Sequence, residues 1–83
     1  MTRDSVRQVL RDHIREAILL MDEPLDDDED LFEAGFDSMA VTRLLVFVEE
    51  TYGVAIGDEE IVSEDVATVN TVAALVCARA ESA

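Results

Sequence analysis

Apolar residues recur at three- and four-residue intervals in three separate stretches of this chain, and this period constrains its fold more than any other feature. The first stretch contains Val6, Val9, Leu10, Ile14, Ala17, Ile18 and Met21. The second contains Val41, Leu44, Leu45, Val48 and Tyr52, and the third contains Val69, Val72, Ala73, Val76 and Ala80. We therefore predict an all-α fold, a small antiparallel bundle of three main helices plus one short helix.

Local signals set the limits of these helices. Pro24 ends the first one at residues 22–24, because the residue before a proline is pushed out of the helical region. The second runs from Ser38 to about Tyr52, where Gly53 supplies a left-handed cap. The other expected features are a cap at Thr2 or Asp4, a cap at Thr68, and short turns starting at Asp58 and covering 63–66.

The charge of the chain is strongly one-sided. Twenty acidic residues stand against six arginines, which gives a formal net charge of −14. Such a surface cannot neutralise the phosphates of nucleic acid, and it disfavours an anionic membrane surface. It favours partners that carry basic patches, or it serves solubility alone.

Length and cysteine use place further limits. The 83 residues form one domain, 1–83, with a modest core and no room for a separate catalytic domain. Cys77 is the single cysteine, so the chain lacks the disulfide framework of a small secreted domain. A basic-then-apolar leader and an apolar run of about 18 residues are also absent from it. We expect a cytoplasmic monomer.

An acidic stretch separates the first two predicted helices. Eight acidic residues lie between Asp22 and Glu33, and we expect Leu25, Leu31 and Phe32 to anchor this loop on the core. Asp26, Asp28 and Asp30 have the spacing of the first EF-hand ligands. The glycine and the glutamate that this loop needs at its sixth and twelfth positions are replaced by Leu31 and Asp37. No tight metal site is predicted.

The chain offers few groups for catalysis. His13 has neither a second histidine nor a nucleophile beside it, and we interpret it as a packed or surface residue. Cys77 lacks a neighbouring base and is interpreted as an inert, partly buried thiol. We therefore expect a non-catalytic protein.

The segment Gly35-Phe36-Asp37-Ser38-Met39 is the best candidate for chemistry. Ser38 stands where the acidic loop meets the second helix, and unpaired backbone N–H groups there favour an attached phosphate. The alternative is that Asp37-Ser38 is simply a helix cap. Met39, Val46 and Phe47 do not all fit on the inward stripe of that helix, so they indicate either a contact surface or a wide buried face.

These residues carry a family resemblance. Leu31-Phe32-Glu33-Ala34-Gly35-Phe36-Asp37-Ser38-Met39, followed by an amphipathic helix that ends in Glu49-Glu50-Thr51-Tyr52-Gly53, closely resembles the acyl carrier proteins and peptidyl carrier proteins. The resemblance extends from the first helix through Ala67-Thr68-Val69 to the last helix.

The resemblance implies a specific site. Ser38 would carry a 4′-phosphopantetheine arm, transferred from coenzyme A by a phosphopantetheinyl transferase, and the arm would hold an acyl or aminoacyl group as a thioester. Asp37 would contact the transferase. The surface read by partner enzymes would comprise Phe36, Asp37, Met39, Arg43, Val46, Glu49 and Glu50. Those partners would be a loading ligase or acyltransferase and a downstream synthase.

The early part of the second helix departs from one branch of this family. Carriers of fatty-acid synthesis typically have acidic residues there, whereas this chain has Ala40 and Arg43. Arg43 and Met39 look more like peptidyl carriers or free-standing carriers of polyketide and nonribosomal-peptide biosynthesis. The alternatives are a fatty-acid carrier, an unmodified acidic helical adaptor and a calcium-binding helix–loop–helix.

Overall fold

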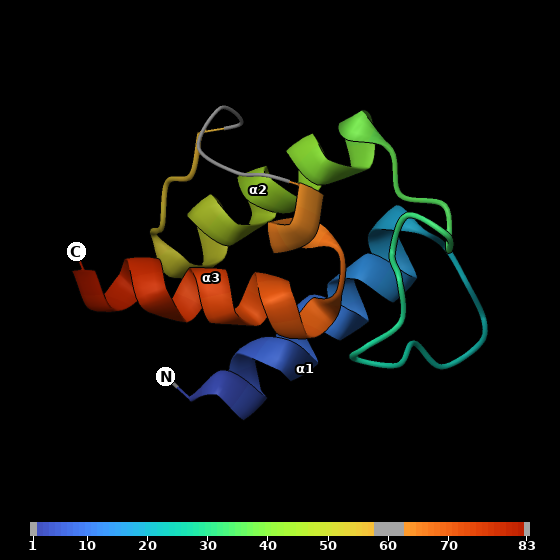
Figure 1. The fold of residues 1–83 in the computed structure, drawn as a ribbon, viewed down its shortest axis with the longest axis horizontal. Helices are drawn as coiled ribbons and strands as arrows, with labels where there is room; N and C mark the ends of the chain where they lie inside the picture. Colours follow the sequence, from blue (N-terminus) through green and yellow to red (C-terminus); the bar gives the residue numbers. More distant parts are fainter. Residues whose placement is uncertain (1, 58–62, 83) are drawn as a thin grey trace.

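The computed structural model describes residues 2–57 and 63–82, and the regular structure in these two ranges is entirely helical (Figure 1). The elements are α1 (Arg3–His13), a π-helical continuation η1 (Ile14–Ile18), α2 (Ser38–Tyr52), a 3-10 turn η3 (Ser63–Val66) and α3 (Val69–Ser82). The predicted all-α fold of three main helices with one short helix is confirmed.

The helices form one bundle. α1 runs in the opposite direction to both α2 and α3, which share a direction because the connector after Tyr52 returns the chain to the end where α2 began (Figure 1). α1 packs against α3, and η1 contacts α2. No helix in the described residues is long and apolar enough to cross a membrane.

The core draws on each helix and on the loops between them. Its largest fully enclosed side chains are Val6, Leu10, Ile14, Leu31, Leu44, Val48, Val66, Val69, Val72 and Val76. Each helix contributes members spaced three or four residues apart, which is the period that the sequence predicted. Ala73 of the third predicted stripe is enclosed as well, the remaining stripe residues are less buried, and Val9 and Ala17 lie on the exposed side.

The first helix ends earlier than predicted. Its last turn widens to a π-helix, in which the Leu19 N–H donates to the Ile14 carbonyl at 2.8 Å. Leu20 then adopts the left-handed conformation, with φ at 52°. This backbone reversal ends the helix before Pro24 exerts any effect, because a left-handed residue cannot continue a right-handed helix.

The acidic loop, residues 19–37, is fastened to the bundle. The Leu31 N–H donates to the Ala67 carbonyl at 2.7 Å, and the Asn70 N–H donates to the Asp27 carbonyl at 3.1 Å. Leu25 and Leu31 are buried, as predicted, and thus anchor the loop. Phe32 was wrongly expected to do the same, because its side chain is 39% exposed.

The connector after α2 follows the sequence signals. Gly53 has φ at 70° and caps the C-terminus of α2. The predicted turn over 63–66 is confirmed as η3, whereas the turn expected from Asp58 lies outside the described residues. The Thr68 hydroxyl accepts a hydrogen bond from the Thr71 N–H at 3.1 Å, which confirms Thr68 as the cap of α3.

Candidate functional site

The N-terminus of α2 is capped by Asp37 and not by Ser38. Asp37 has extended backbone, and its Oδ1 accepts a hydrogen bond from the Ala40 N–H at 2.9 Å. Ser38 is the first residue of the helix, it is exposed, and its hydroxyl makes no hydrogen bond to the described residues. The cap interpretation therefore applies to Asp37 and leaves the Ser38 hydroxyl available for chemistry.

The backbone around Ser38 suits a negatively charged group. The first N–H groups of a helix have no acceptor one turn earlier, and here Asp37 occupies that of Ala40 alone. The N–H groups of Ser38 and Met39 lie at the positive end of the helix dipole. A phosphate attached to Ser38 would lie where such groups stabilise its charge.

An open cavity of about 230 Å³ adjoins this serine. It is lined by Ser38, Met39, Thr42 and Arg43, four residues that form two neighbouring pairs one helical turn apart. The Thr42 hydroxyl donates to the Ser38 carbonyl at 3.0 Å. Thr42 was not singled out from the sequence, although its position four residues after Ser38 was a usable signal.

The exposed residues of α2 line up behind Ser38. Met39, Arg43, Val46 and Glu50 follow one another at steps of four, three and four residues, so they share one face of the helix, with Glu49 beside them. Met39 is 65% exposed and Val46 is 50% exposed. We call these five residues the α2 surface. Of the two interpretations left open by the sequence, a contact surface fits Met39 and Val46 better than a wide buried face.

Phe47 does not belong to the α2 surface. Its ring stacks on His13, with 3.7 Å between the ring centroids and 8° between the planes. His13 is half-buried by this contact, and burial lowers the pKa of its imidazole. The two residues join the end of α1 to α2, so His13 acts in packing, as the sequence suggested.

Phe36 was expected among the residues that contact partner enzymes, and its burial contradicts this expectation. Its side chain is only 5% exposed, so it packs in the core and cannot offer a partner a contact surface. Phe32 meets it edge-on, with 6.3 Å between the ring centroids. Phe36 lies two residues before Ser38, so its burial anchors the chain on the core just before α2 begins.

The turn that precedes Phe36 depends on glycine. Gly35 has φ at 122°, a conformation that other residues rarely adopt. The Phe36 N–H then donates to the Leu31 carbonyl at 2.9 Å, which closes the turn and directs Phe36 inward. Gly35 thus acts on the position of Ser38 without touching it.

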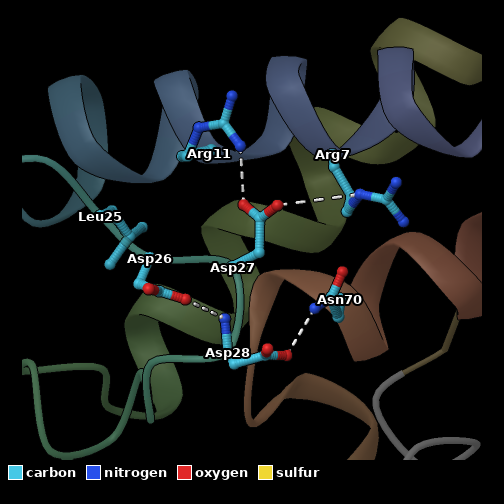
Figure 2. A pocket seen from close by; sticks show the side chains of 7 residues that line it. All are labelled: Arg7, Arg11, Leu25, Asp26, Asp27, Asp28 and Asn70. Atoms are coloured by element: carbon cyan, nitrogen blue, oxygen red, sulfur yellow. Dashed lines mark hydrogen bonds and ion pairs between the residues drawn. The ribbon is translucent and has the colours of Figure 1, made fainter.

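The carboxylates of the acidic loop bind groups of the protein itself. Asp26 Oδ1 accepts from the Asp28 N–H at 2.9 Å, and Asp30 Oδ1 accepts from the Phe32 N–H at 2.9 Å. Figure 2 shows a second open cavity, of about 500 Å³, in which Asp27 points between Arg7 and Arg11. Among the described residues, no group of three potential ligands is arranged to hold a metal ion.

Cys77 is separate from these features. It lies on α3 with its side chain 9% exposed and forms no disulfide. Burial, and secondarily the neighbouring Cys77 thiol, raise the pKa of Tyr52 at the end of α2. These two side chains therefore belong to the packing of α2 on α3.

Comparison with known proteins agrees with this geometry. The family model described as phosphopantetheine attachment site matches residues 8–76, which include the second half of α1, all of α2 and the first part of α3. A search of curated proteins finds no significant match. An exposed serine hydroxyl at a helix N-terminus, beside an open cavity, is a suitable attachment point for such a group. The chain therefore belongs to the phosphopantetheine-attachment family of acyl and peptidyl carrier proteins, and its cofactor is covalently bound 4′-phosphopantetheine.

Proposed function

We propose that Ser38 carries the 4′-phosphopantetheine arm and that the chain is a non-catalytic carrier of acyl or aminoacyl groups. The observation that supports this assignment is the hydroxyl of Ser38, which is exposed on the first residue of α2 and has no hydrogen bond to the part of the chain that the structure describes. The cap function that would otherwise engage a serine at this place is performed by Asp37. The arm supplies a terminal thiol on which a cargo is held as a thioester.

The residues around Ser38 have distinct roles in this proposal. The free N–H groups of the first turn of α2 stabilise the charge of the phosphodiester. Asp37 uses one carboxylate oxygen for the cap, and as an exposed residue it presents the other to a phosphopantetheinyl transferase. Phe36 and Gly35 hold the start of α2 in place from within.

Partner enzymes would dock on the α2 surface. Its residues continue from Ser38 along one face of the helix, with Met39 and Val46 as the exposed apolar contacts. Glu49 and Glu50 add negative charge to a chain whose net charge is already −14. Basic surfaces around partner active sites are attracted to such a face, and this attraction raises the rate of encounter.

Arg43 supports a role outside housekeeping fatty-acid synthesis. It is exposed in the α2 surface at a place where fatty-acid carriers typically have acidic residues. We propose that this carrier acts in polyketide or nonribosomal-peptide biosynthesis, as a cytoplasmic monomer loaded by a dedicated ligase or acyltransferase. A downstream synthase then receives the cargo.

Mass spectrometry of the intact protein tests the attachment. Incubation with coenzyme A, magnesium and a broad-specificity transferase should add one phosphopantetheine to the wild type. Ser38→Ala should gain no mass, whereas Ser5→Ala, which alters an exposed serine in the first turn of α1, should be modified normally. An unmodified wild type would indicate an acidic adaptor instead. The mass of protein from its native host, with cargo attached, would separate natural-product carriage from fatty-acid carriage.

A further inference from the structure

Arg43 is isolated from the other basic residues of this chain. It is the single arginine between Arg15 and Arg79, and the chain contains no lysine. Arg7 and Arg11, by comparison, are held by Asp4 and Asp27. Arg43 is exposed and forms no ion pair with the described residues. An unpaired guanidinium in so acidic a protein is available to an anion that the protein does not itself supply.

The position of Arg43 points to where that anion lies. Arg43 lines the same open cavity as Ser38, together with Met39 and Thr42. Its Cα lies about 7.5 Å beyond that of Ser38 along the helix axis, at 1.5 Å per residue. Side chains on a helix lean toward its N-terminus, so the Arg43 side chain has the direction and the length to reach back past Met39 toward the first turn.

The surroundings of Ser38 make a counter-charge useful there. Asp37 is exposed next to Ser38, and its carboxylate would repel a phosphodiester attached to the serine hydroxyl. The N–H groups of the first turn offset part of that repulsion. Among the described residues, Arg43 is the one basic side chain that lines the cavity, and its planar fork of donors matches a phosphate with two parallel hydrogen bonds.

We propose that, in the undocked carrier, the Arg43 guanidinium binds the phosphodiester that joins the arm to Ser38. This inference rests on the proposed attachment at Ser38. The ion pair fixes the side of α2 from which the arm leaves, between Met39 and Thr42, so that the cargo emerges along the α2 surface. Arg43 is thus a positioning residue for the arm, in addition to any contact it makes with partners.

NMR spectroscopy of the unloaded protein tests the ion pair directly. Arginine labelled with ¹⁵N reports how fast the Arg43 Nε–H exchanges with water, before and after coenzyme A and transferase convert the protein to its modified form. Modification should slow this exchange by about two- to fivefold, the protection that an exposed ion pair provides. The ³¹P resonance of the phosphodiester should shift in Arg43→Gln and should shift less in Arg43→Lys, which keeps the charge but not the fork.

Arg3→Gln is the matched control. It removes one exposed arginine from the start of α1, at the end of the molecule opposite the start of α2 (Figure 1). Its ³¹P resonance should equal that of the wild type. Unchanged exchange of the Arg43 Nε–H after modification, or the same ³¹P resonance in Arg43→Gln and wild type, would overturn the inference while the attachment at Ser38 stands. If the Arg43 Nε–H exchange slows only after the arm is loaded with a carboxylate-bearing cargo, Arg43 binds the cargo and not the phosphodiester, and the inference is overturned. If the wild type gains no phosphopantetheine mass at all, both the attachment at Ser38 and the ion pair with Arg43 are contradicted.

Discussion

The Asp27 carboxylate accepts a hydrogen bond from the Arg11 guanidinium at 2.7 Å, and this ion pair fastens the acidic loop to α1 (Figure 2). The second carboxylate oxygen lies 3.8 Å from Arg7 Nε. The backbone carbonyl of Asp27 also accepts a hydrogen bond from the Asn70 N–H at the start of α3. One residue therefore joins the loop to two helices, although the loop is crowded with like charges.

Asp27→Asn should destabilise the fold. The substitution removes a partly buried charge from two arginines, and we expect a loss of about 1 kcal/mol, at the upper end of exposed ion pairs. In a domain of this size that loss lowers the Tm by about 4–8 °C. Thermal unfolding followed by circular dichroism measures it. The control is Glu23→Gln, which removes an exposed acid from the same loop. Equal Tm values for the two variants would contradict a specific role of Asp27.

The contact between His13 and Phe47 should make stability depend on pH. Burial lowers the pKa of His13 below its usual 6.5, so the folded protein binds the proton less readily than the unfolded chain. The contribution of neutral His13 to the free energy of unfolding is therefore fully present above pH 6.5, and it is lost as the pH decreases through the lowered pKa. His13→Phe keeps an aromatic stack and removes the titration.

The free energy of unfolding, measured in urea between pH 7.5 and 5.5, checks this expectation. The wild type should lose stability relative to His13→Phe as the pH falls across that interval. Carboxylates of the loop are present in both proteins, so their titration cancels in the difference. A difference that stays constant with pH would show that protonation of His13 does not oppose folding.

The left-handed cap of α2 should tolerate asparagine better than alanine. Gly53 has φ at 70°, and a Cβ added there would meet no atom within 4 Å. The cost of Gly53→Ala is thus due to backbone conformation alone, and we expect about 1 kcal/mol. Gly53→Asn should cost less, because asparagine enters the left-handed region more readily. Chemical denaturation of both variants measures the order, and a more stable alanine variant would contradict it.

Periodicity predicted the helices because each one buries a stripe of side chains at helical spacing. Leu44 and Val48 of α2 and Val72 and Val76 of α3 are enclosed as expected. The limits of α2 were also predictable, since Ser38 follows a capping residue and Gly53 ends the helix. These features depend on interactions within a few residues, which the sequence displays directly.

Features that depend on tertiary contacts were harder to predict from the sequence. Phe32 and Phe36 are both aromatic residues near the same turn, and the sequence does not distinguish the exposed Phe32 from the buried Phe36, which follows the left-handed Gly35. The end of the first helix at Leu20 carries no signal, because leucine is not a residue that favours the left-handed region. The pairing of Asp27 with Arg11 joins residues 16 positions apart, and the seven other acids between Asp22 and Glu33 were equal candidates.

The last prediction concerns the α2 surface as a docking face. Glu49 and Glu50 are exposed, so the double change to lysine should leave the fold intact while slowing loading by the cognate enzyme. Charges at the rim of an interface act mainly on association, and the effect should appear in KM and shrink as salt rises.

Val46→Asp should be more harmful, because it places a charge among the apolar contacts, and we expect a loss of roughly tenfold in affinity. Val46 is 50% exposed, so the Tm of the Val46→Asp variant should stay near that of the wild type. Val48→Asp is the contrasting variant, because Val48 is fully enclosed and its substitution should unfold the protein. Loading rate and Tm measured together distinguish a docking defect from a packing defect. Normal loading of Val46→Asp and of the double lysine variant at low salt would mean that partner enzymes bind another surface.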